Sequence, residues 1–191
     1  TATSPALVQQ RMDAIAGSDL SDILFTSGTT GNPKGVMTSH EQNLRAFTSF
    51  ADILGLCSGD RYLVINPFFH SFGYKAGILT CLIKGVTLLP HAVFDASDIL
   101  ARIARDRISV LPGPPTLFQS LLAHPALDQH DLSTLKRATT GAAVIPVEMI
   151  HQMKKRLGFE TVITAYGLTE SCGLVTMCRA GDSAEIIATT S

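Results

Sequence analysis

Short apolar runs alternate along the chain with longer segments in which apolar residues recur every three to four positions. The short runs are bounded by polar, Gly- or Pro-containing stretches, a pattern typical of buried β-strands. The longer segments have the period of amphipathic helices. The runs predict strands at Asp22–Thr26, Tyr62–Asn66, Val86–Leu89, Ser109–Leu111, Arg137–Thr140, Thr161–Ala165 and, less clearly patterned, Leu174–Cys178.

The clearest helical period lies in Ser39–Leu54, where Leu44, Phe47, Ala51 and Leu54 fall on one face. Two overlapping capping-box patterns, T-x-x-E and S-x-x-Q, mark its beginning. A second helix is predicted at Val147–Leu157, where Pro146 is a start signal and Gly158 a stop signal. A third is predicted at Asp98–Arg105.

The alternation of strand and helix predicts an α/β fold with a mostly parallel sheet flanked by helices on both faces. The first segment, 1–19, reads as a linker or a loosely packed helix, and 20–191 as one α/β subdomain. Ligands of such sheets bind where strands end and loops lead into helices. We therefore expect a site formed by five unusual loops: Thr26–Gly35, Pro67–Gly73, Pro112–Pro115, Gly141–Ala143 and Tyr166–Glu170.

Composition excludes several classes of protein. The 15 Lys and Arg residues nearly balance the 16 Asp and Glu residues, so no electrostatic field attracts nucleic acid. No apolar run approaches the roughly 20 residues of a transmembrane helix. The 4 cysteines form no C-x-x-C pair and indicate reduced thiols. We expect a cytoplasmic protein without a transmembrane segment.

The stretch TSGTTGNPKG at Thr26–Gly35 combines glycines, hydroxyls and one lysine. Backbone N–H groups and hydroxyls in such a loop can cradle phosphates, with Lys34 as a mobile cation. A surface turn of the same composition is an equally good interpretation of this stretch alone. It does not match G-x-x-x-x-G-K-[ST], because Gly35 stands where Ser or Thr would bind magnesium.

Four blocks in order resemble the adenylate-forming superfamily of acyl-CoA synthetases, peptide-synthetase adenylation domains and luciferases. The first is Thr26–Gly35, which is similar to the family's phosphate loop. PFFHSFG, TTGAAVIP and TAYGLTES follow it at Pro67–Gly73, Thr139–Pro146 and Thr164–Ser171. The His in PFFHSFG is more typical of the CoA-ligase branch, and neighbouring segments resemble actinobacterial fatty-acid–CoA ligases.

The resemblance implies roles for individual residues. The phosphate loop would wrap the outer phosphates of ATP, and Lys34 would lie at its flexible tip. Glu170 would hold Mg²⁺ and Thr169 would bond the α-phosphate. Because many members have Gly at the place of Ala142, this residue is expected to alter the purine or acyl contact slightly. The implied catalytic residues are Lys34, Thr169, Glu170 and His70; the nucleotide-binding residues are Thr26, Ser27, Gly28, Thr29, Thr30, Gly31, Gly141, Ala142, Ala143, Tyr166, Gly167 and Thr169; the acid-binding residues are His70, Phe72, Gly73 and Ala165.

The implied chemistry is attack of a carboxylate on the α-phosphorus of ATP, which gives an acyl adenylate and pyrophosphate, followed by transfer of the acyl group to coenzyme A. The protein needs to position two anions and offset the developing charge. The partners would be a small carboxylic acid, ATP and coenzyme A. A bicyclic propanoate derived from steroid rings is one candidate acid, beside fatty and aromatic acids.

The chain matches only part of such a synthetase, since the upstream part, the ribose-binding block and the C-terminal lid domain lie outside it. We therefore expect little ligase activity from this chain alone and self-association through exposed apolar faces. Two alternatives stay open: another ATP-using enzyme that releases ADP, and a non-catalytic α/β interaction module.

Overall fold

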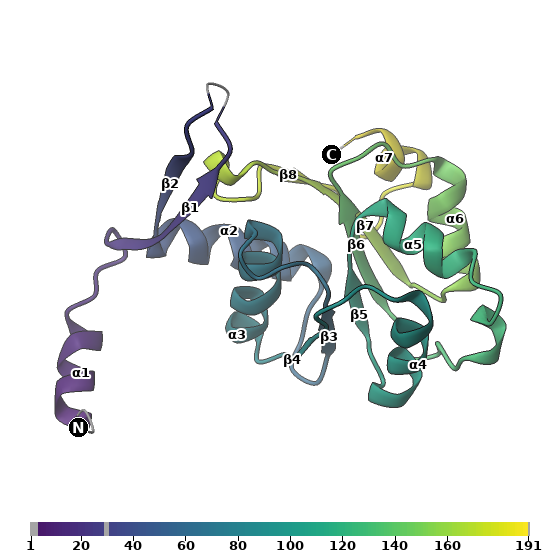
Figure 1. The fold of residues 1–191 in the computed structure, drawn as a ribbon, viewed down its shortest axis with the longest axis horizontal. Coiled ribbons are helices and arrows are strands. Elements are labelled where there is room, and N and C mark those ends of the chain that lie inside the picture. The colour runs from purple at the N-terminus through teal and green to yellow at the C-terminus, as the bar shows by residue number, and fades with distance from the viewer. Residues whose placement is uncertain (1–3, 29–30, 191) are drawn as a thin grey trace.

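A six-stranded sheet forms the centre of the computed structural model, which describes residues 4–28 and 31–190 (Figure 1). Its strand order is β4-β3-β5-β6-β7-β8, and all neighbours are parallel except β7 and β8. The predicted α/β fold with a mostly parallel sheet is confirmed. The strands are β3 (Arg61–Val64), β4 (Thr87–Pro90), β5 (Val110–Pro112), β6 (Arg137–Gly141), β7 (Thr161–Tyr166) and β8 (Thr176–Met177).

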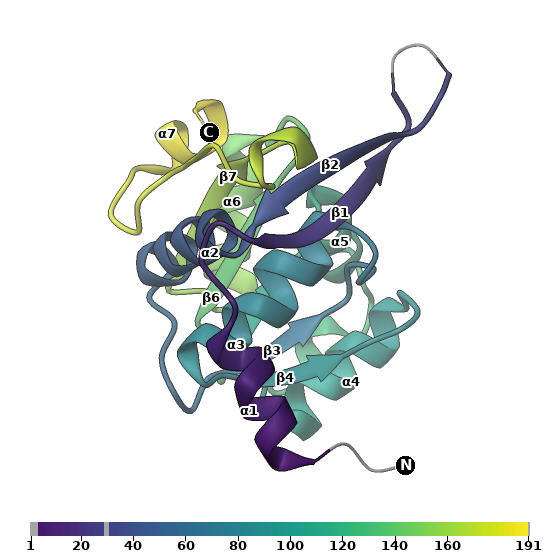
Figure 2. The ribbon, with the colours of Figure 1, turned by 90° about the vertical axis from the view of Figure 1, so that its left-hand side faces the viewer.

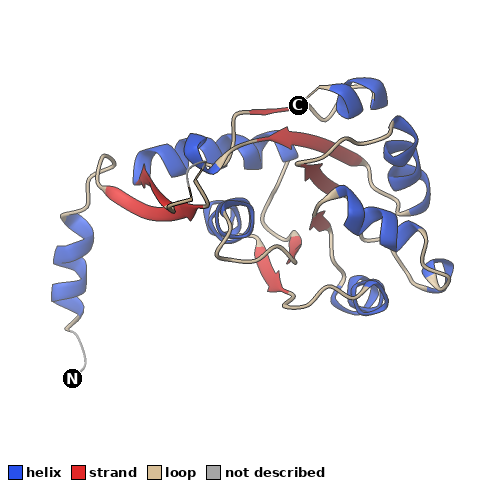
Figure 3. Ribbon diagram, turned by 45° about the horizontal axis from the view of Figure 1, so that its top comes forward, coloured by secondary structure: helices blue, strands red, loops and turns tan. Residues whose placement is uncertain are grey.

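Helices cover both faces of this sheet (Figures 1 and 3). Strand β4, which follows β3 in the chain, lies on one side of β3 in the sheet, and the next strand, β5, lies on its other side. The strand order therefore reverses between β3 and β5. Ligands of open α/β sheets bind at such a reversal. One face carries α2 (His40–Leu54), the π-helix η1 (Phe72–Leu79) and α3 (Thr80–Lys84); the other carries α4 (Ala96–Asp106), α5 (Pro115–Leu122) and α6 (Val147–Arg156), and α7 (Ala184–Thr189) lies beside α6.

Helix α2 begins and ends as its sequence predicts. The Ser39 side chain accepts a hydrogen bond from the backbone of Gln42, whose side chain accepts one from the Ser39 backbone, so the S-x-x-Q pattern forms the capping box. Gly55 ends the helix with a left-handed φ of 73°. The buried side chains Phe47 and Phe50 of this helix pack into the core.

The hairpin of β1 (Leu20–Thr26) and β2 (Lys34–Ser39) forms a separate two-stranded antiparallel sheet and extends away from the body (Figure 2). The expectation that Thr26–Gly35 lies at the carboxyl edge of the parallel sheet is therefore wrong. The short strand β2 has a single buried residue, Thr38, and too little apolar pattern to be recognised in the sequence. Pairing of Phe25 with Gly35 makes this stretch a hairpin connection instead.

The π-helix η1 was not predicted and begins at Phe72, inside the PFFHSFG block. Its wide turns leave backbone carbonyls for side-chain donors: the Tyr62 hydroxyl donates to Ala76 O at 2.8 Å, and the Thr80 hydroxyl donates to Lys75 O at 2.9 Å. Single stretches of π-helix occur frequently at functional sites. Here the helix places Phe72 and Ala76 toward a cavity at the sheet edge.

The N-terminal helix α1 (Pro5–Asp13) begins at the Ser4 cap and has no buried residue. It lies apart from the sheet in Figures 1 and 3. No helix in the part of the chain that the structure describes is long and apolar enough to cross a membrane.

Candidate functional site

Four loops meet at the carboxyl edge of the parallel sheet, where they surround a cavity of about 370 Å³. Each loop follows a different strand, β3, β5, β6 or β7, as the sequence analysis expected for these four segments. The cavity adjoins the reversal of strand order between β3 and β5. The loops contribute Asn66, His70, Ser71, Gly113, Pro114, Gly141, Ala142, Gly167 and Leu168 to its walls.

The cavity brings together many residues that were assigned to the nucleotide and to the acid. Gly141, Ala142, Tyr166 and Gly167 of the nucleotide set line it, as do His70, Phe72 and Ala165 of the acid set. Ala143 and Gly73 are not among its lining residues. Gly73 is instead buried beneath the loop, close to the backbone oxygens of Asn66 and Pro67.

Gly141 is required where β6 passes β7. A Cβ atom at this position would lie 2.3 Å from Ala165 O, a distance that no real Cβ contact shows. The absence of a side chain lets the two backbones meet at the cavity wall. This placement is compatible with the assigned passage of Gly141 beside a flat ring.

His70 reaches the cavity from the loop before η1 and is exposed to solvent. Its Nδ1 accepts a hydrogen bond from the backbone N–H of Phe72 at 3.1 Å. An accepting Nδ1 in a neutral imidazole leaves the proton on Nε2. His70 can therefore donate from Nε2 to an oxygen atom in the cavity.

The sequence analysis missed the wall that helix α2 contributes. Phe47 and Phe50 line the cavity, together with Leu174 and Gly173 from the loop before β8. Phe47 lies on the apolar face of the predicted helix, and this position predicts a residue of the hydrophobic core. The period of a helix identifies its buried face but does not indicate which buried side chains border a cavity.

A side-chain hydrogen bond joins the phosphate-loop hairpin to the TAYGLTES turn. The Thr26 hydroxyl donates a hydrogen bond to Glu170 Oε1 at 3.1 Å. Glu170 belongs to the short helix η3 (Thr169–Ser171), which follows β7. A second cavity of about 380 Å³ begins beside this contact, and Glu170, Arg45 and Gln42 are among the residues that line it.

Lys34 does not lie at the tip of the loop. It begins β2, opposite Thr26 in the strand register, because the ladder extends further than the sequence pattern indicates. Its side chain passes Gly28, whose φ of 64° and closeness to Asn32 O exclude a Cβ atom. Ser27 and Gly31 also belong to this connection, whereas Thr29 and Thr30 lie outside the described residues.

The donor atoms near Glu170 suit a magnesium ion that arrives with a nucleotide. Within residues 4–28 and 31–190, no three His, Cys, Asp or Glu side chains are grouped to hold a metal ion. Mg²⁺ is usually held by one or two carboxylates together with substrate phosphates. The Glu170 carboxylate beside the Thr26 hydroxyl offers hard oxygen donors of this kind.

Ala142 has a left-handed backbone with a φ of 63°, an unfavourable conformation for alanine. We expect Ala142→Gly to raise the free energy of unfolding by about 0.5–1 kcal/mol, because relief of this strain exceeds the added entropy of the unfolded chain. Ala143→Gly is the matched control, since Ala143 has no positive φ, and it should lower the same quantity. Urea titrations of both variants test this, and a loss of stability in Ala142→Gly would contradict it.

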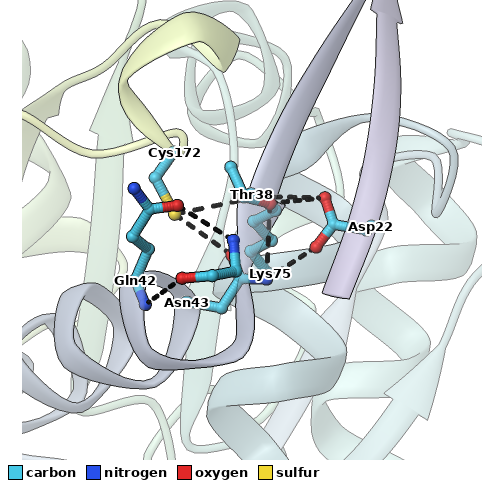
Figure 4. A network of polar contacts seen from close by, with 7 residues as sticks. Asp22, Thr38, Gln42, Asn43, Lys75 and Cys172 are labelled. Carbon is cyan, nitrogen blue, oxygen red and sulfur yellow. Dashed lines mark hydrogen bonds and ion pairs between the residues drawn. The ribbon is translucent and has the colours of Figure 1, made fainter. Parts of the chain in front are cut away.

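A buried polar network connects the hairpin to the body of the protein (Figure 4). The Lys75 ammonium group, on η1, lies 3.2 Å from Asp22 Oδ1 and donates to Thr38 Oγ1 at 3.0 Å. Thr38 and Asn43 donate to the two oxygens of Asp22, at 2.8 and 2.6 Å. The Cys172 thiol donates to Asn43 Oδ1 at 3.1 Å. The sequence signal for this network is a lone lysine inside an apolar segment.

Burial raises the pKa of the Cys172 thiol, and the charge of Asp22 adds to this effect, while the charge of Lys75 opposes it. The thiol therefore keeps its proton at neutral pH and can donate it to Asn43. Burial and the charge of Asp22 also raise the pKa of Tyr74, which lies next to Lys75 on η1. The charge of Asp22 thus raises the pKa of both the Cys172 thiol and the Tyr74 hydroxyl.

The model of one family, described as AMP-binding enzyme, matches residues 2–190 of this chain. The chain belongs to this family. The match confirms the resemblance of the four blocks to adenylate-forming enzymes and extends it over almost every residue. The relatives of this AMP-binding chain are acyl-CoA ligases.

Two relatives share the name 3-[(3aS,4S,7aS)-7a-methyl-1,5-dioxo-octahydro-1H-inden-4-yl]propanoyl:CoA ligase. The protein from Mycobacterium tuberculosis is 56% identical over 96% of this AMP-binding chain, and that from Rhodococcus jostii is 49% identical over 95%. The matches cover 36% and 35% of those proteins. The chain thus spans about a third of the length of these relatives.

Solved structures of the family superimpose on this AMP-binding chain. The N-terminal domain of FACL13 from Mycobacterium tuberculosis matches with a TM-score of 0.80 and 26% identity, over 96% of this chain and 47% of that one. ATP-bound MatB from Rhodopseudomonas palustris matches with a TM-score of 0.77 and 26% identity, over 89% of this chain and 33% of that one. The chain therefore shares its fold with about half of the N-terminal domain of FACL13.

Proposed function

We propose that this chain is the ATP-binding part of an acyl-CoA ligase that forms an acyl adenylate and pyrophosphate from a carboxylic acid and Mg·ATP, then transfers the acyl group to coenzyme A. One observation carries the proposal: four residues assigned to the nucleotide (Gly141, Ala142, Tyr166 and Gly167) and three assigned to the acid (His70, Phe72 and Ala165) line the same cavity at the sheet edge. The reaction joins these two substrates, so their sites have to be adjacent.

In this proposal the cavity walls orient the two substrates. Tyr166 lies against the adenine ring, and the backbone of Gly141 and Ala142 passes beside it. His70 donates from Nε2 to the acid, next to Phe72, and Thr169 bonds the α-phosphate. No side chain acts as a nucleophile, because the carboxylate itself attacks.

The hairpin and the Glu170 turn hold the phosphates from the other side. Ser27, Gly28 and Gly31 supply donors from the loop, and Lys34 supplies a positive charge from the start of β2. Glu170 is the residue that would hold Mg²⁺, which when bound offsets the charge on the phosphates. Thr26 fixes the orientation of the Glu170 carboxylate through its hydrogen bond.

The first test of this function is the product formed from ATP. An adenylate-forming ligase gives AMP and pyrophosphate in the presence of acid and coenzyme A. A different ATP-using enzyme would release ADP, and an interaction module would leave ATP unchanged. Chromatography of nucleotides after incubation with the protein, extended at both ends to the length of its relatives, distinguishes these three outcomes.

We further propose a bicyclic propanoate derived from steroid rings as the acid, because two relatives with 56% and 49% identity carry the name of a ligase for this compound. Competition between this acid, palmitate and benzoate in turnover by the extended protein tests the choice. If palmitate or benzoate is used faster, the assignment of this acid fails while the ligase function stands.

We propose that ligase activity requires polypeptide outside these 191 residues, since the chain spans only 36% of the M. tuberculosis relative. An upstream part and a C-terminal lid domain would complete the site and exclude water. The division at residue 19 into a linker and an ATP-binding subdomain stays a prediction, as does the location in the cytoplasm.

The exposed face of the hairpin leads us to expect self-association of this chain. Phe25 and Met37 are 74% and 68% exposed on the same sheet, and Ile23 pairs with Met37 beside them. Burial of such apolar area in a second copy releases about 25 cal/mol per Å². Sedimentation at increasing concentration should show dimers or larger species, and Phe25→Ser/Met37→Ser should shift them to monomer. A native chain that stays monomeric at high concentration would contradict this.

A further inference from the structure

The proposed function assigns no role to Lys75, although this lysine is fully buried. Lys75 is 0% exposed, and its ammonium group contacts Asp22 and Thr38 of the hairpin (Figure 4). A buried ion pair is often no more stabilising than apolar side chains of the same volume. A satisfied buried network does, however, fix one arrangement of the segments that contribute to it.

The network joins the two segments that meet at the proposed phosphate site. Asp22 precedes Thr26 on β1, and Cys172 follows Glu170 directly after η3. Asn43 of α2 bridges them, because it donates to Asp22 and accepts from Cys172. The contact between Thr26 and Glu170 therefore lies between two segments that are held by the same network.

The backbone contributes little to the position of the hairpin. In the ranges 4–28 and 31–190, β1 and β2 pair only with each other and form no ladder with the six-stranded sheet. The described backbone hydrogen bonds that join the hairpin segment to the body are those of His40 with Asp19 and Glu41 with Gly17, at the start of α2. Beyond these bonds and the direct continuation of β2 into α2, the Lys75 network contributes side-chain contacts that hold the hairpin relative to the Glu170 turn.

We propose that Lys75 is a positioning residue for ATP: through Asp22 and Thr38 it holds the β1–β2 hairpin at the distance from the Glu170 turn at which both can contact the phosphates. This inference rests on the proposed function. Lys75 itself does not contact the substrate. A positioning role predicts a change in the KM for Mg·ATP without a change in the KM for the acid.

The test is steady-state kinetics of acid-dependent AMP formation by the extended protein and its Lys75→Met variant. Because a displaced hairpin loses hydrogen bonds to the charged phosphates, we expect the KM for Mg·ATP to rise about tenfold or more, which corresponds to a loss of about 1.4 kcal/mol of binding free energy. The KM for the acid should stay within about twofold, since the Lys75 side chain is not among the residues that line the cavity. Lys84→Met is the matched control, because Lys84 pairs with Asp52 at the surface.

A second variant separates positioning from stability. Asp22→Asn/Lys75→Met leaves no lone buried charge and is expected to fold even where Lys75→Met does not. A raised KM for ATP in this folded variant, with the native KM for the acid, supports the inference. Native KM values, or equal increases for ATP and acid, would overturn it. Absence of AMP formation in the unsubstituted extended protein would overturn the proposed function instead, and this inference with it.

Discussion

Lys75→Met should lower the free energy of unfolding of this chain by about 3–5 kcal/mol, the usual effect of removing one partner from a buried ion pair. The substitution leaves the Asp22 carboxylate, whose side chain is 12% exposed, without its cation. It also removes the donor to Thr38. Urea titration followed by circular dichroism measures the change.

Two control variants separate the buried pair from the general effect of losing a lysine. Lys84→Met removes a partly exposed partner of Asp52 and should change stability by about 0–1 kcal/mol. Asp22→Asn/Lys75→Met should lose less than Lys75→Met alone, because neither buried charge is left unpaired. Equal losses in Lys75→Met and Lys84→Met would contradict the role of the network.

Glu170→Gln should reduce acid-dependent AMP formation by the extended protein about 100- to 1,000-fold, the range for loss of one group that stabilises charge in a transition state. Glutamine keeps the size of the side chain and can still accept from the Thr26 hydroxyl, but it lacks the charge that would hold Mg²⁺. The rate of AMP formation at saturating Mg·ATP measures the effect.

Glu160→Gln provides the matched control for this prediction. Glu160 is exposed just before β7, away from both cavities, and its replacement should leave the rate within about twofold of native. Unfolding curves of the two variants should coincide. A Glu170→Gln protein with near-native activity would exclude Glu170 as the magnesium ligand.

The sequence predicts those parts of the fold in which local patterns agree with the final packing. Helix α2 has its capping box, its apolar face and its terminal glycine in the sequence, and it forms where expected. The strands β6 and β7 are recognised for the same reason, since the three consecutive residues buried in each are uncharged.

The elements that were missed or misplaced depend on contacts between distant residues. Strand β2 has a single buried residue, Thr38, and its pairing with β1 makes it a strand. The π-helix η1 relies on the hydroxyls of Tyr62 and Thr80, which bond its free carbonyls. No local pattern indicates such partners. For the same reason Thr26–Gly35 was expected as a loop at the edge of the parallel sheet and not as part of a hairpin.

The candidate site was predicted in part for a related reason. The loops after β3, β5, β6 and β7 were correctly expected at one edge, because the ends of parallel strands coincide. The wall formed by Phe47 and Phe50 comes from a helix that precedes the sheet, and the Lys75 network joins five separate segments. Such groupings follow from tertiary packing, which spacing along the chain does not encode.

The most direct measurement is acid-dependent exchange of pyrophosphate into ATP, carried out on this chain and on the protein extended to the length of its relatives. Exchange reports the reversible formation of an acyl adenylate and does not require coenzyme A. We expect exchange in the extended protein and little or none in the 191-residue chain. Absence of exchange in the extended protein with fatty, aromatic and steroid-derived acids would contradict the assignment of the cavity to adenylate formation.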